Sequence, residues 1–318
     1  VYTESENGKF KKNAFEVASY ASEVANQLGT SVTAVSVNAS DNESLGAYGV
    51  SKVLNISDEK LKTFNAKAYA HAIVEAAGKE GAQVVVVSSS SDTKFLAPIV
   101  AAKLSAGYTP NVVSAPESTS PFTVKRTAFS NKGFAHTQIN SDIKIIGVLN
   151  NAFGAVENKL DVSVESFSPS LGDADFATKS VEVDQVVGKA TIADADIVVS
   201  GGRGLKGPEN WGMLEDLAEV LGAATACSKP VSDLGWRPHG EHVGQTGKPV
   251  ASNLYIAIGI SGAIQHLAGV SSSKTKVVIN TDPEAPFFKA ADYGIVGDAF
   301  EIVPQLTEKL KEFKAQNA

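Results

Sequence analysis

The sequence predicts an α/β protein with two doubly wound domains: a mainly parallel N-terminal sheet with an antiparallel extension, and a Rossmann-like C-terminal domain. Apolar, β-branched runs alternate with helical stripes in both halves of the chain, as in parallel sheets covered by helices. Residues 122–167 instead show short strand-like runs separated by tight turns. The polar stretch Ser168 to Gly188 separates the halves, and 318 residues are enough for two domains.

The first domain is predicted over residues 1–185. Small and apolar residues recur at every fourth position from Phe64 to Ala76, a stripe that can face a sheet. The strands expected in its first part are Ser31 to Val37 and Gln83 to Ser88, and the helices are Asn13 to Leu28, Lys62 to Lys79 and Thr93 to Ala106.

The antiparallel extension is predicted between residues 122 and 167. The turn residues Asn131, Lys132 and Gly133 are typical of a hairpin. Short turns elsewhere in this region would also let neighbouring strands pair in opposite directions. The four expected strands are Thr123 to Ser130, Phe134 to Ile139, Ile143 to Leu149 and Leu160 to Phe167.

The second domain is predicted over residues 186–318. It is expected to turn as a body about Ser168 to Gly188, because few contacts should cross a short polar linker. Three leucines mark one face of a helix from Asn210 to Leu221, and Pro304 suits the first turn of a last helix ending at Lys314. The expected strands are Ile197 to Ser200, Ala223 to Cys227, Leu254 to Gly259, Val277 to Asn280 and Gly294 to Val296.

Composition excludes several classes of function. A formal charge of −7 and a pI near 5.4 argue against a general nucleic-acid binder, which needs a basic face. No apolar run reaches the length of a membrane span, and no signal peptide is visible. Cys227, the only cysteine, cannot form an internal disulfide and fits a reducing compartment. His239, His242 and His266 lack an accompanying ligand pattern, so no metal site is expected.

The stretch Leu254 to Gly269, LYIAIGISGAIQHLAG, is the strongest indication of a ligand site. An apolar strand runs into a turn containing Gly259, Ser261 and Gly262, and a short helix follows. Free amides at such a helix start can bind phosphate oxygens. Gln265 and His266 add polar groups on the same helix. These residues favour a nucleotide site, and a βα unit without a ligand is the alternative.

Two polar glycine loops extend this pattern. Ser200 to Lys206, SGGRGLK, follows a strand but lacks the GxGxxG spacing; its Arg203 could clamp a phosphate, pair with a carboxylate of another chain or be solvated in a tight turn. Val243 to Lys248, VGQTGK, does not satisfy the P-loop pattern. Its Gln245 and Thr246 suit the donor and acceptor edge of a heterocycle, unless this is an ordinary surface loop.

Polar residues also follow two later strands. Asn280 begins the segment NTDPEAPF directly after an apolar strand, where open α/β sheets bind ligands. Asp298 follows the strand Gly294 to Val296. Its carboxylate could accept a hydrogen bond from a ribose hydroxyl or an adenine amine, or it could cap the next helix.

Together these loops resemble one family. LYIAIGISGAIQHLAG matches the signature of the electron-transfer flavoprotein alpha subunit, and SGGRGLK, VGQTGK, NTDPEAPFF and ADYGIV are similar to the same family in the same order. The resemblance covers the second domain closely and the first domain loosely. It implies that the second domain binds FAD, while the first is a nucleotide-hydrolase-like scaffold that contacts a beta subunit.

The resemblance also implies the function. Such a heterodimer, with AMP in the beta subunit, accepts electrons from dehydrogenases such as acyl-CoA dehydrogenases and passes them to a membrane quinone oxidoreductase. It is an electron carrier with no substrate turnover of its own. The compartment implied is the bacterial cytoplasm or the mitochondrial matrix. The rivals are a flavin-dependent oxidoreductase acting on a small substrate, an adenine-nucleotide-binding regulatory protein, and an electron-bifurcating member of the same family.

Residue roles follow from the same resemblance. Ser261, Gly262, Gln265 and Asn280 would hold the pyrophosphate and ribityl portion of FAD, and Asp298 would meet its adenosine end. Gln245 and Thr246 would face the flavin ring, His266 its O2 edge, and Arg203 would dock the domain against the beta subunit. The full set of candidate cofactor-binding residues is Arg203, Ser228, Lys229, His242, Val243, Gly244, Gln245, Thr246, Gly259, Ile260, Ser261, Gly262, Ala263, Gln265, His266, Asn280 and Asp298.

The chain departs from the family pattern at two of these positions. Lys229 stands where the family usually has arginine, and His242 where it often has glutamine. Lys229 is expected to keep its ammonium near the ring and to stabilise the negative charge that reduction creates there. A solvated lysine before Pro230 is the alternative.

Overall fold

A computed structural model describes residues 1–129, 131–183, 191–192 and 195–317. The chain forms two compact units, one comprising residues 1–128 and 133–184, the other residues 129–132 and 185–318. The predicted domain boundary at residues 185 and 186 lies outside the described residues. The α/β class with parallel sheets in both units is confirmed.

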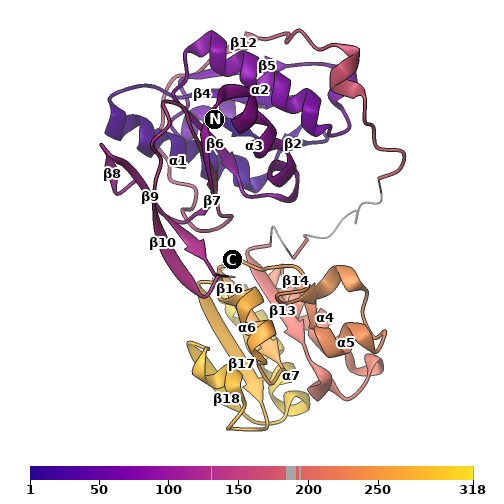
Figure 1. Cartoon of the computed structure of the whole chain (residues 1–318). Helices are drawn as coiled ribbons and strands as arrows, with labels where there is room; N and C mark the ends of the chain where they lie inside the picture. Colours follow the sequence, from indigo (N-terminus) through magenta and orange to yellow (C-terminus); the bar gives the residue numbers. More distant parts are fainter. Residues whose placement is uncertain (130, 184–190, 193–194, 318) are drawn as a thin grey trace. The chain divides into compact units, whose positions relative to one another are not determined.

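The first unit contains two sheets that carry helices on both faces (Figure 1). One core packs α2 (Ala66–Glu80) and α3 (Ser91–Leu104) against one side of the strands, and a second core packs α1 (Lys12–Leu28) against the other. The order in the first sheet is β1-β4-β5-β12, over Tyr2–Thr3, Thr33–Val37, Lys52–Ile56 and Ser163–Ser166.

The second sheet of this unit contains the predicted hairpin. Its order is β10-β9-β7-β11-β6, over Gly133–Gln138, Phe122–Ala128, Gly107–Val112, Lys144–Val148 and Val84–Ser88. β9 and β10 pair antiparallel, with Ala128 opposite Gly133, which confirms the hairpin. Two short pairs complete the unit: β8 (Ser118–Thr119) beside β9, and β2 (Ser5–Glu6) with β3 (Lys9–Phe10).

The antiparallel extension was predicted too long. β11 lies parallel to both β6 and β7, and β12 lies parallel to β5. Among the described strands from β7 to β12, the antiparallel pairs are the hairpin, β8 with β9 and one contact of β7 with β9. The reason is that β11 lies between β6 and β7, and β12 lies beside β5 at the edge of the other sheet, whereas β5 and β7 were not predicted as strands.

Two helix starts also differ from the prediction. α2 begins at Ala66 rather than Lys62, because the Asn65 side chain accepts hydrogen bonds from the amides of Lys67 and Ala68. The last helix, α7 (Ala299–Gln316), begins five residues before Pro304, which lies inside it. Asp298 caps α7 through the amide of Phe300, so the alternative reading of Asp298 as an N-cap holds for the local structure.

The second unit is built on one parallel six-stranded sheet. Its order is β15-β14-β13-β16-β17-β18, over His242–Val243, Ala224–Ser228, Ile197–Gly201, Leu254–Ile258, Thr275–Asn280 and Tyr293–Val296. One core contains α6 (Ile264–Val270) and the other contains α4 (Gly212–Leu221) and α7, so helices cover both faces (Figure 1). The chain runs outward from β13 in both directions, and the strand order reverses between β13 and β16.

Candidate functional site

Two glycine-containing loops meet where the strand order reverses, at the carboxyl ends of β13 and β16. Ligands of open α/β sheets bind at such a switch point. Gly204 N donates to Gly259 O at 3.1 Å. A Cβ at Gly202 would lie 2.1 Å from Gly259 O, and one at Gly204 2.6 Å from Gly259 Cα. No side chain fits between these two backbones, which is the physical reason for glycine in both loops.

A cavity of about 860 Å³ opens beside these loops. It falls in the size range of small-molecule and cofactor sites. The loops after β13, β14, β15, β16 and β17 all reach it. The candidate residues on its wall are Arg203, Ser228, Lys229, His242, Val243, Gly244, Gln245, Thr246, Gly259, Ile260, Ser261, Gly262, Ala263, Gln265, His266 and Asn280. Asp298 is the one candidate that does not line it.

The loop after β16 presents free backbone amides. Ser261, Gly262 and Ala263 donate no backbone hydrogen bond within the described part of the chain. The loop is fixed from both sides: Phe287 N donates to Ser261 O at 3.0 Å, and Asn280 Nδ2 donates to Ile260 O at 3.0 Å. Unpaired amides held in one orientation suit anionic oxygens.

His266 lies inside α6 and is buried. Its Nε2 is 2.9 Å from the Tyr255 hydroxyl, and its ring stands 6.0 Å from that of Phe287. Burial lowers the pKa of His266 to about 4, so the imidazole is neutral at pH 7. Its Nδ1 is buried and forms no side-chain hydrogen bond among the described residues, although the backbone of Val243 interacts with the ring and acts to raise its pKa.

Lys229 starts the short helix α5 (Lys229–Asp233), directly after Ser228. Its Nζ lies 2.9 Å from Asp233 Oδ1, one helical turn later, and both side chains are about half exposed. The ammonium therefore stands on the cavity wall as part of an ion pair. Neither sequence-based reading of Lys229 included this pair with Asp233, and a position of the ammonium near the flavin ring stays a prediction.

Asp298 serves the start of α7. Besides accepting from Phe300 N at 3.0 Å, its carboxylate lies 3.8 Å from Lys206 Nζ, in an exposed pair.

Four further wall residues were not predicted: Gly204, Pro230, Asp233 and Leu234. Asp233 had a usable signal, because an acid four residues after Lys229 can meet it on one helix face. The contact of Tyr255 with His266 had no such signal in the sequence. Tyr255 occurs within an apolar strand, and the β16 loop separates it from His266.

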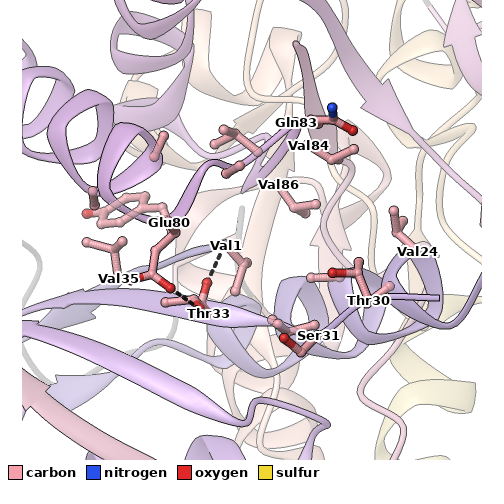
Figure 2. Close-up of a pocket in the computed structure, with 18 of the residues that line it drawn as sticks. Val1, Val24, Thr30, Ser31, Thr33, Val35, Glu80, Gln83, Val84 and Val86 are labelled. Atoms are coloured by element: carbon pink, nitrogen blue, oxygen red, sulfur yellow. Dashed lines mark hydrogen bonds between the residues drawn. The ribbon is translucent and has the colours of Figure 1, made fainter. Parts of the chain in front are cut away.

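A smaller cavity of about 350 Å³ lies in the first unit, lined by residues of α1, α2 and the strands β4 and β6 (Figure 2). Valines dominate the labelled part of its lining. Its carboxylate, Glu80, accepts from Thr33 Oγ1 at 3.0 Å and pairs with Lys52 at 2.8 Å. Because Glu80 is already paired with Thr33 and Lys52, it is not available to a ligand in this cavity. The cavity of the second unit is therefore the better candidate site.

The larger cavity fits a phosphate-linked dinucleotide. It lies at the switch point, its β16 loop offers free amides, and its far wall carries polar side chains. No group of three or more His, Cys, Asp or Glu side chains in the described residues could hold a metal ion. Fold and site thus define a dinucleotide-binding α/β protein.

Two family models together match most of the chain. The electron transfer flavoprotein domain matches residues 1–186, and the electron transfer flavoprotein FAD-binding domain matches residues 191–271. The chain belongs to the electron transfer flavoprotein alpha-subunit family, and its cofactor is FAD.

Relatives named electron transfer flavoprotein subunit alpha are similar over most of their length. The protein from Bacillus subtilis is 40% identical over 268 residues, which are 83% of this chain and 82% of that one. The protein from Thermoanaerobacterium thermosaccharolyticum is 34% identical, covering 99% and 98%. The protein from Pseudomonas aeruginosa is 37% identical, covering 96% and 97%. Among the described residues, no helix has the length and hydropathy of a membrane span.

Proposed function

We propose that this chain is the alpha subunit of a heterodimeric electron carrier. Its beta subunit holds AMP, and the pair accepts electrons from dehydrogenases such as acyl-CoA dehydrogenases and delivers them to a quinone oxidoreductase of the respiratory chain. The observation that carries the proposal is the switch-point cavity in a chain that belongs to this family. The compartment is the bacterial cytoplasm or the mitochondrial matrix; similar proteins occur in bacteria and, under a mitochondrial name, in Caenorhabditis elegans.

FAD, when bound, supplies reversible electron uptake, and the residues of the chain bind it and tune it. The free amides of Ser261 and Gly262, with Gln265, hold the pyrophosphate. Asn280 fixes that loop, since its side chain donates to Ile260 O and accepts from Asp282 N. These contacts anchor the cofactor without any proton transfer.

Other residues serve the ring and the two ends of the site. Gln245 and Thr246 face the ring edge. The backbone amide of Gln245 donates to the backbone carbonyl of Gln265 at 2.8 Å and fixes the position of Gln245. Asp298 meets the adenosine end, and Arg203 docks the unit against the beta subunit. The other candidates on the wall, including Ser228, Val243 and Ala263, shape the cavity.

His266 is the donor to the O2 edge in this proposal. If the Tyr255 hydroxyl donates to Nε2, the neutral imidazole carries its proton on Nδ1, the atom without a side-chain partner. A neutral donor favours the reduced ring, because negative charge develops at that edge. The low pKa of His266 supports donation rather than a fixed positive charge.

The test is to co-express the chain with the beta subunit of the same organism. The absorbance spectrum should show one FAD per heterodimer, and an acyl-CoA dehydrogenase with its substrate should reduce that FAD stoichiometrically. The chain alone should retain flavin poorly, because the proposed site is completed at the subunit interface. Direct turnover of a small substrate, or a flavin-saturated isolated chain, would contradict the proposal. Two FAD per heterodimer would favour the bifurcating alternative.

A further inference from the structure

His242 is a buried residue on the cavity wall, and the described residues form no hydrogen bond with its ring nitrogens. The residue is only 5% exposed, and it lines the cavity. None of the hydrogen bonds formed within the described residues ends on either nitrogen of its ring. A buried imidazole without a partner is costly unless a ligand, water or proton satisfies it.

Backbone contacts fix the position of His242. It forms β15 with Val243, parallel to β14, with His242 opposite Cys227. Lys248 N donates to His242 O at 2.8 Å, which closes the turn that follows. A Cβ at Gly247 would lie 2.9 Å from His242 Cγ, and a Cβ at Gly244 3.5 Å from Nε2. The ring is thus packed against a glycine turn.

The charges around His242 nearly balance. From α5, Lys229 disfavours and Asp233 favours a charged imidazole, and these two groups are paired with each other. His239 is the first residue of the short helix η6 (His239–Glu241), and its ring lies 6.3 Å from that of His242. The remaining neighbours are the neutral His266 of α6, the thiol Cys227 of β14, whose pKa burial raises to about 12, and Glu241, which pairs with Arg237.

Burial is the largest cause that lowers the pKa of His242 below its ordinary value. The imidazole is therefore neutral at pH 7 before any charge enters the cavity. A negative charge placed in the cavity acts in the opposite direction and raises that pKa. Because Asp233 already compensates Lys229, a titrating imidazole is the group best placed to answer the new charge.

We propose that His242 takes up one proton when negative charge develops on the flavin held in this cavity, and so makes the reduction potential of this chain depend on pH. The electron comes from the reductant and the proton from bulk water. No bond to the cofactor forms or breaks. The added proton binds the ring nitrogen of His242 that is unprotonated in the neutral imidazole. The inference rests on the proposed seating of the flavin ring beside the loop Val243–Thr246.

The experiment is a reductive titration of the heterodimer with dithionite between pH 5.5 and 8.5, for the wild type and for His242→Gln. Glutamine keeps hydrogen-bonding groups but cannot titrate. The potential of the wild type should rise above that of the variant as pH falls, by up to about 59 mV for each tenfold increase in proton activity. At high pH, where His242 stays neutral in both redox states, the difference should stop changing. Protonation of the flavin itself is common to both proteins and cancels in the difference.

His239→Gln is the matched control. His239 is exposed, its Nδ1 lies 3.0 Å from Ser232 Oγ, and it does not line the cavity. The reduction potential of His239→Gln, plotted against pH, should run parallel to that of the wild type. Parallel curves for His242→Gln and wild type would overturn the inference.

A second measurement is needed in case His242→Gln loses FAD. In the wild-type heterodimer, NMR titration of the His242 ring should give a higher pKa in the reduced than in the oxidised form. Equal values in the two forms would overturn the inference. A heterodimer that shows the pKa change but accepts no electrons from a dehydrogenase would refute the proposed function alone.

Discussion

At the residue scale, the ion pair between Lys229 and Asp233 decides how strongly Lys229 can act on a ring in the cavity. A unit charge about 4 Å away contributes about 1 kcal/mol at the dielectric constant of water and about 4 kcal/mol at an effective value of 20. Lys229 is half exposed and paired, so the lower figure applies. That corresponds to about 40 mV for one electron.

Lys229→Ala should therefore lower the first one-electron potential of the bound flavin by about 40 mV. Lys229→Arg should keep or raise that potential, because the charge stays and a planar guanidinium can stack on the ring. Spectroelectrochemical titration of the heterodimers measures both. Asp233→Asn is the control of opposite sign, since it frees the ammonium and should raise the potential. An unchanged potential in Lys229→Ala would mean that the lysine is only a solvated surface group.

The neutral His266 makes the second unit sensitive to acid. An unfolded chain binds a proton at this histidine near pH 6.5, whereas the folded chain binds it only near pH 4. Its contribution to stability is complete above about pH 6.5 and is lost as pH falls toward 4, by at most about 3 kcal/mol.

Urea unfolding of the wild type and of His266→Gln at pH 7.5 and 5 tests this. Both tryptophans, Trp211 and Trp236, belong to the second unit, so their fluorescence reports on it alone. The wild type should lose more stability than His266→Gln between the two pH values. The buried Glu4 titrates with the opposite sign, but it belongs to the first unit and is common to both proteins. Equal losses would show that His266 is already protonated or exposed in the folded chain.

At the scale of the elements, the sequence left two roles open for Asp298: a cap on the following helix and a contact with the adenosine end of FAD. The structure shows the cap on α7; contact with the adenosine end of FAD remains a proposal. Asp298→Ala should cost about 1 kcal/mol of unfolding free energy and weaken FAD retention. Asp298→Ser should recover the stability, because serine also caps a helix, but not the FAD retention, because the carboxylate is gone. Tryptophan fluorescence in urea and flavin release on dilution give the two readings. Full FAD retention in Asp298→Ser would reduce Asp298 to a cap.

The sequence predicts elements well where one residue type controls the local structure. Asn131 to Gly133 predicted the hairpin, because these residues suit a tight connection. The glycines after β13 and β16 indicated tight turns, and the structure adds that the two loops approach too closely for a side chain. It fails where the answer depends on distant partners. β11 is parallel only because β6 and β7 flank it, which no local pattern encodes. Pro304 suggested a helix start, yet the cap at Asp298 sets the start earlier.

The same division holds for the cavity wall. Loops after consecutive strands could be predicted to meet, since the carboxyl ends of parallel strands lie on one edge of the sheet. The pairing of Lys229 with Asp233 and of His266 with Tyr255 could not, because each depends on side-chain orientation.

At the scale of the whole molecule, the described part of the predicted hinge, Ser168 to Gly188, is largely anchored to the first unit. Ser170 donates from its amide and hydroxyl to Glu75, and Asp175 Oδ2 lies 2.9 Å from His71 Nδ1. Phe167, Leu171 and Phe176 pack against the core that includes α2 and α3. Asn65 Nδ2 donates to Thr178 O, the last of these contacts along the chain. We therefore expect the predicted pivot of the second unit to lie beyond Thr178.

Thermolysin, which cleaves before bulky apolar residues, can test this placement. Leu171 and Phe176 are packed, whereas Val181 is 97% and Val183 54% exposed. The first cut in the native heterodimer should fall before Val181 or Val183, leaving two stable fragments identifiable by mass spectrometry. In a His71→Ala, Glu75→Ala double variant, cuts before Leu171 and Phe176 should appear, because the side-chain contacts that hold the segment on α2 are removed. Early cleavage before Leu171 in the wild type would place the pivot inside the anchored segment and contradict the prediction.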